Sequence, residues 1–108
     1  MANTFKSYTD ASIGTSTSDL YTVPSATTAV VIGCVLANTT GNQVNGNLII
    51  NKSTGDDIFL VKNIPLPNGS SFEFNAGSKI ILESGDKIQV SSDTASSVDA
   101  IVSVLEQS

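Results

Sequence analysis

Apolar and polar residues alternate along most of the chain, which is the pattern of half-buried β-strands. In residues 44–51, Val44, Leu48 and Ile50 share one parity, while asparagines occupy the other. The same two-residue period recurs around Phe72 and Phe74, which flank Glu73. Such segments are typical of antiparallel strands with one face in a core and the other in water.

Turn-forming residues separate these segments at intervals of roughly eight to twelve residues, a spacing typical of β-sandwiches and barrels. The expected strands cover residues 5–13, 18–23, 28–37, 44–52, 57–63, 70–75, 79–83, 86–92 and 97–106. The sequence therefore predicts an all-β chain that forms an antiparallel β-sandwich, jelly-roll or immunoglobulin-like, of eight to nine strands. Composition agrees with this, because Ile, Val and Thr outnumber Ala and Leu by about two to one and β-branched side chains favour strands.

The strand expected over residues 28–37 is apolar on both faces. Its even positions include Val30, Ile32 and Leu36, and we expect these larger side chains to be almost fully buried. Cys34 lies on the same face, where a free cysteine acts as a small core residue.

The odd positions of that strand and the last strand supply a second apolar face. Val31 and Val35 lie on the former, and Ile101 and Leu105 on the latter. Either loops or the N-terminal segment cover this face, or it packs on a neighbouring subunit. Because monomers rarely expose large contiguous apolar patches, these four residues are the predicted subunit interface.

The polar stretch over residues 14–18 separates the first segment from the rest of the chain. We therefore divide the sequence into residues 1–19, an N-terminal arm or extra strand, and residues 20–108, the sandwich domain. We expect residues 1–19 to contact a neighbouring protein more than their own sandwich, so that deleting residues 1–13 would leave the fold intact.

Composition excludes most enzyme chemistry. The chain has one Cys and no His, Trp or Arg, so neither a Ser-His or Cys-His dyad nor a structural zinc site can form within it. The adjacent acids Asp56 and Asp57 would diverge on a strand, and no ladder of acids accompanies them. We therefore expect no catalytic residues, no metal and no cofactor.

Charge and hydropathy limit the partners. The formal net charge is −5, from ten acidic residues and five lysines, which disfavours nucleic acid and anionic membranes. No apolar run approaches the twenty residues of a membrane-spanning helix, and the N-terminus shows no signal-peptide pattern.

Six segments in order carry a resemblance to known proteins. They read YTVPSATTAVVIG at 21–33, LANTTG at 36–41, LVKNIPLPNGSS at 60–71, KIILESGDKIQV at 79–90, SSVD at 96–99 and SVLE at 103–106. Together they resemble small virion structural proteins of tailed bacteriophages. The resemblance covers roughly residues 20 to 106 and rests on strand-and-turn patterns, and none of these motifs is catalytic.

The resemblance implies a virion protein assembled in the host cytoplasm and favours a capsid decoration or cement protein that binds the major capsid protein. It also implies a homo-oligomer, with a trimer favoured because decoration proteins occupy three-fold capsid positions. A neck or tail component is the alternative within the virion. A binding module for host-surface carbohydrate is the alternative outside this class, and there Tyr21 would stack on a sugar ring.

Overall fold

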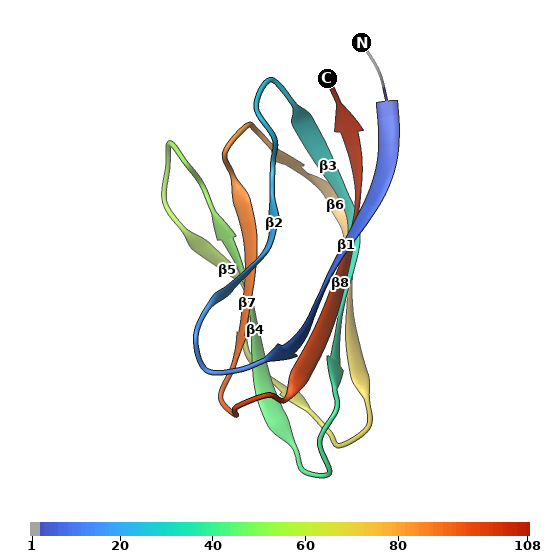
Figure 1. Cartoon of the computed structure of the whole chain (residues 1–108), viewed down its shortest axis with the longest axis vertical. Coiled ribbons are helices and arrows are strands. Elements are labelled where there is room, and N and C mark those ends of the chain that lie inside the picture. Colours follow the sequence, from blue (N-terminus) through green and yellow to red (C-terminus); the bar gives the residue numbers. More distant parts are fainter. Residues whose placement is uncertain (1–2) are drawn as a thin grey trace.

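Two four-stranded antiparallel sheets pack face to face in the computed structural model, which describes residues 3–108 apart from the side chains of residues 75–79 (Figure 1). The strands are β1 (Asn3–Ile13), β2 (Ser18–Thr22), β3 (Thr28–Asn38), β4 (Val44–Asn51), β5 (Ile58–Leu66), β6 (Ser71–Leu82), β7 (Lys87–Ser92) and β8 (Val98–Gln107). The first sheet has the order β1-β8-β3-β6 and the second the order β2-β7-β4-β5. The predicted all-β antiparallel sandwich is confirmed. The strands expected over 70–75 and 79–83 are united in β6.

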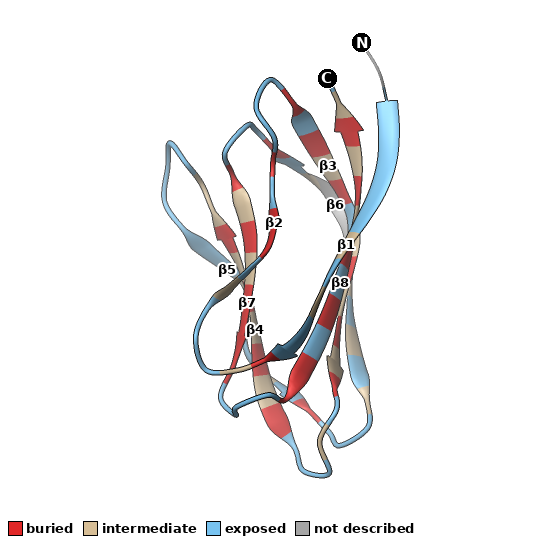
Figure 2. Ribbon diagram, viewed as in Figure 1, coloured by how far each residue is buried: buried red, intermediate tan, exposed pale blue. Residues whose placement is uncertain are grey.

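The core lies between the sheets and follows the alternation of the sequence. Along β8, every second residue from Val98 to Glu106 is buried, and along β4 every second residue from Val44 to Ile50 is buried (Figure 2). The largest fully buried apolar side chains are Leu36, Leu48, Leu66, Leu82, Ile88, Val23, Val90, Val98, Val102 and Val104. They come from both sheets, so each sheet covers the apolar face of the other.

A β-bulge at Ile32 reverses the two faces of β3. The register of β3 shifts between Val31 and Gly33 against both β6 and β8. Before the bulge the odd residue Val31 is buried, and after it the even residue Leu36 is buried, each at 3% exposure or less. An extra residue in one strand changes the face of all residues that follow.

The predicted burial of the even face is therefore right for only part of the strand. Leu36 and Cys34 are buried as predicted. Ile32, at 47% exposure, and the half-buried Val30 contradict the prediction. Simple alternation through residue 32 placed both on the wrong face.

The N-terminal segment belongs to the sandwich as strands. β1 pairs with β8 along the edge of the first sheet, and β2 pairs with β7 in the second sheet. Ile13, at the end of β1, is 2% exposed and joins the core. β1 and β2 each complete a sheet, so the described part of residues 1–19 forms strands of the sandwich. That residues 1–19 contact a neighbouring protein more than their own sandwich stays a prediction.

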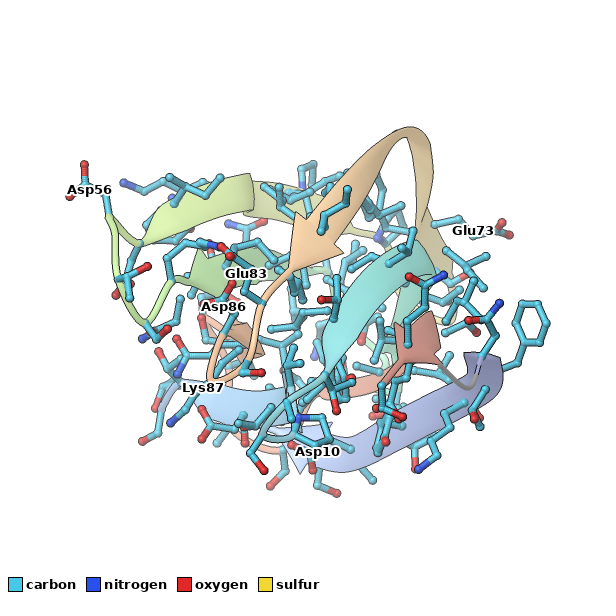
Figure 3. The ribbon with its side chains drawn as sticks, turned by 90° about the horizontal axis from the view of Figure 1, so that it is seen from above. Asp10, Asp56, Glu73, Glu83, Asp86 and Lys87 are labelled. Carbon is cyan, nitrogen blue, oxygen red and sulfur yellow. The ribbon has the colours of Figure 1, made fainter. Side chains whose placement is uncertain are left out.

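Asp86 anchors the β6–β7 turn to the β4–β5 loop at one end of the sandwich (Figure 3). Its carboxylate is fully buried and accepts hydrogen bonds from Nζ of Lys52 and from the backbone amides of Ser53 (3.0 Å) and Glu83 (2.9 Å). Burial alone would raise the pKa of Asp86, but these donors outweigh it and hold the pKa at about 2. The network fixes two loops that are far apart in sequence.

Candidate functional site

An unbroken row of apolar side chains crosses the outer face of the first sheet. Phe5 of β1 lies opposite Leu105 of β8, Leu105 opposite Val30 of β3, and Val30 opposite Ile81 of β6. Directly opposed residues on neighbouring strands point to the same face, so the four form one row, here called the outer row. With strands about 4.8 Å apart, the row extends about 14 Å across the sheet.

The two ends of the outer row are the most exposed. Phe5 is 75% exposed and Ile81 is 59% exposed, while Leu105 and Val30 between them are half-buried. Each of the three residues on β8, β3 and β6 is flanked along its strand by side chains that are buried or pack against the core. The pleat therefore directs the outer row away from the core.

A second, shorter apolar stretch lies further along the same face. Val35 is directly opposite Ile101, and both line a shallow hollow of about 300 Å³ with Ala37, Thr9 and others. Small residues separate the two apolar stretches, because Ser7 pairs with Ser103 and Ser103 with Gly33. The bulged Ile32 borders a second hollow, of about 360 Å³, beside the outer row.

The structure brings together three of the four residues predicted for the interface. Val35 and Ile101 are in register, and Leu105 belongs to the outer row on the same face. The prediction is wrong for Val31, which is 3% exposed and pairs with the buried Val104, so it faces the core. The same bulge that exposes Ile32 directs Val31 inward.

Four members of this face were not predicted from the sequence. Phe5, Val30, Ile32 and Ile81 all lie on it. A signal for Ile81 was present, because Ile80, Ile81 and Leu82 form an apolar triplet that must place one side chain on the opposite face. Phe5 lay in a segment assigned outside the sandwich domain.

A carboxylate and two phenols lie between the sheets at one end. Glu106, 7% exposed, accepts a 2.6 Å hydrogen bond from Tyr21 and a 3.1 Å hydrogen bond from Tyr8. Nζ of Lys6 is 3.5 Å from its other oxygen. The hydrogen bond from Tyr21 is the main cause that lowers the pKa of Glu106, while burial raises the pKa of Tyr21 above its ordinary value. These groups satisfy one another, so the cluster joins the sheets.

Tyr21 is also the residue proposed to stack on a sugar, and its position contradicts that role. It is 3% exposed, and Leu20 beside it is 5% exposed. A register shift of β2 between Asp19 and Tyr21 lets both side chains face the core. The tyrosine ring is thus inaccessible to a ligand.

The remaining candidate groups are the Cys34 thiol, buried in β3, and the adjacent acids Asp56 and Asp57. Burial raises the pKa of the Cys34 thiol to about 12. Asp56 and Asp57 are exposed at the β4–β5 turn. Within residues 3–108, leaving aside the side chains of 75–79, no group of three or more His, Cys, Asp or Glu is placed to hold a metal ion.

No protein-family model fits the chain, and no curated protein sequence is similar enough to count as a relative. The described residues also contain no helix long and apolar enough to cross a membrane.

Proposed function

We propose that this protein is a structural component of a tailed-bacteriophage virion, a decoration or cement protein that binds the capsid surface through protein–protein contacts. The resemblance of residues 20 to 106 to small virion proteins supplies the class of particle. The proposal assigns no catalytic activity, cofactor or nucleic acid to the chain.

The outer row carries the proposal. Phe5 and Ile81, at the two ends of the outer row, are 75% and 59% exposed. A partner protein that covers them would gain binding free energy, because burying apolar surface contributes about 25 cal/mol per Å². The four side chains carry no charge, and the hollow beside Phe5 and Ile32 can receive a side chain of a partner. Apolar residues surrounded by small polar ones are typical of an interface centre with a polar rim.

The major capsid protein is the proposed partner at this face. The acidic net charge of −5 favours a neutral or basic region on the capsid surface, since like charges across an interface oppose association. The contact needs no specific small molecule, which agrees with shallow hollows rather than a deep cleft.

The test uses the phage that encodes the protein, with this gene deleted and the tagged protein supplied during infection. Particles are purified on a density gradient and probed for the tag. We expect the protein to sediment with the particles, and immunogold labelling to place it on the head. Its absence from the particles would overturn the proposal, whereas labelling of the neck or tail would support the alternative virion position.

A pair of variants tests whether the outer row is the contact. Ile81→Glu places a charge in the outer row, and we expect it to reduce incorporation at least tenfold. Phe59→Glu is the matched control, because Phe59 is 50% exposed and pairs with Ile49 on the outer face of the second sheet. Equal incorporation of both variants would show that another surface binds the capsid.

A further inference from the structure

The four edge strands of the sandwich differ in how well they are protected. The edges are β1 and β6 of the first sheet and β2 and β5 of the second. Native sheets protect edges with proline, bulges, very short strands or charged side chains such as Lys, because an open edge can pair with another chain. β5 contains Pro65 and two register shifts, and β2 has five residues and one shift. β6 shifts register against β3 between Ile80 and Asn75.

The edge of β1 has no proline or bulge over most of its length, and its two charges, Lys6 and Asp10, have opposite signs. It pairs with β8 without interruption from Asn3 to Asp10, and its bulge comes only between Asp10 and Ile13. It contains no proline. Most of its residues are exposed, and the strand lies at the outside of the molecule (Figure 2).

We propose that β1 pairs edge to edge, antiparallel, with β1 of a second copy of this chain, with Tyr8 opposite Tyr8. The pairing joins two first sheets into one continuous eight-stranded sheet. It is independent of the proposed virion role, because it requires only the chain itself.

The charges of β1 select this register. A two-fold antiparallel pair places one residue opposite its own copy, and the residues before it oppose those after it. With Tyr8 at the centre, Lys6 of each copy lies opposite Asp10 of the other. Opposite charges directly across two strands stabilise the pair, whereas like charges destabilise it.

The neighbouring registers are less favourable. Centring the pair on Lys6 sets two lysines against each other, and centring it on Asp10 sets two aspartates against each other. Centres at Ser7 and Thr9 leave both charges without an opposite partner. Only the centre at Tyr8 forms two charge pairs.

The side chains on both faces are compatible with this register. Lys6, Tyr8 and Asp10 pair with the buried residues Val104, Val102 and Ala100, so they share the inner side of the sheet. The Lys6 side chain is 48% exposed beside the almost buried Glu106, and it lies at the open edge where Asp10 of the second copy would arrive. On the outer side, Ser7 lies opposite Thr9, and Phe5 opposite Ala11.

The first test measures the mass of the protein in solution and the effect of a charge reversal on dimer formation. The full chain at about 50 µM should sediment at twice 11.1 kDa. Asp10→Lys places Lys6 of each copy opposite a lysine at position 10 of the other. We expect this repulsion to raise the dimer dissociation constant about tenfold. Asp56→Lys is the control, because it makes the same charge change at a site that Figure 3 shows well away from Asp10.

The second test fixes the register by cross-linking. Ser7→Cys and Thr9→Cys are prepared as separate variants, and the native Cys34 is buried with a raised pKa and does not compete. An oxidised equimolar mixture should give a 7–9 disulfide, since directly opposed residues are within disulfide reach. Each variant alone should cross-link at least tenfold more slowly, because its two cysteines are then two residues out of register.

Four outcomes would overturn the proposal. They are a monomeric mass, a trimeric mass, equal effects of Asp10→Lys and Asp56→Lys, or faster cross-linking of one variant alone than of the mixture. A trimer would instead support the oligomer expected from the sequence resemblance, which needs a surface other than a two-fold edge.

Discussion

Tyr21 of the second sheet donates a 2.6 Å hydrogen bond to Glu106 of the first sheet, and this bond crosses the space between the sheets. Both residues are buried, at 3% and 7% exposure. Tyr8 donates to the same oxygen from 3.1 Å, and its ring lies 4.6 Å from that of Tyr21. A buried carboxylate is tolerated when hydrogen-bond donors replace water, so these phenols determine how stably this end of the sandwich closes.

Tyr21→Phe should lower the free energy of unfolding by about 1.5–3 kcal/mol, since a hydrogen bond to a charged group is lost inside the core. Tyr8→Phe makes the same chemical change at a longer and less buried bond, and it should cost less. Urea unfolding of the three proteins measures the difference. Equal costs would show that the buried bond contributes no more than the partly exposed one.

The stability of the fold should fall in acid because of Asp86. Its pKa is held at about 2, below the ordinary 3.8, so the folded state binds the proton more weakly than the unfolded state. The resulting stabilisation is fully present above about pH 4 and is lost as the pH falls toward 2. Glu106 acts in the same direction, since its pKa is also lowered.

Asp86→Asn should therefore flatten the pH dependence of unfolding between pH 4 and 2 and should cost about 1–3 kcal/mol at pH 7. Urea midpoints from pH 2 to 7 give both quantities. Asp56→Asn is the control at an exposed turn position and should retain the slope of the unaltered protein. An unchanged slope for Asp86→Asn would contradict the anchoring role of this carboxylate.

The bulge in β3 gives opposite expectations for two apolar residues of the same strand. Leu36 is 1% exposed. Replacing it by alanine should lower the free energy of unfolding by about 2–5 kcal/mol, because a cavity remains. Ile32 is 47% exposed, and Ile32→Ala should lower the free energy of unfolding by less than about 1 kcal/mol. Thermal and urea unfolding of both variants check the register, and a larger cost for Ile32→Ala would place the bulge elsewhere.

The sequence was sufficient to predict the two-layer fold, and the reason is the regular period of two. In β4 and β8 this period runs without interruption, so the faces of residues such as Leu48 and Val102 follow directly. Bulges limited how much of the rest could be predicted. Those at Ile32 and Leu20 insert one residue each, and no residue type marks their position.

The candidate face was predictable only in part for the same reason. Val35, Ile101 and Leu105 lie beyond the bulge or on the regular β8, and their shared face followed from alternation. Val31 lies before the bulge, so its face was reversed. Phe5 and Ile81 required knowledge of which strands are neighbours, and strand order depends on long-range packing that local patterns do not contain.

Deletion of residues 1–13 should destabilise the sandwich, contrary to the expectation from the sequence. The deletion removes β1, its whole pairing with β8, the buried Ile13 and the hydrogen bond from Tyr8 to Glu106. The free energy of unfolding should fall by more than the roughly 2–5 kcal/mol of a single large-to-small core substitution. Circular dichroism melts at a fixed protein concentration measure this change. Phe5→Ala is the control, because it keeps β1 and shortens only a side chain that is 75% exposed, so it should change stability by less than about 0.5 kcal/mol. A truncated chain that melts at the same temperature as the full chain would show that β1 is a dispensable addition to a seven-stranded core, and would return residues 1–13 to the role of an arm.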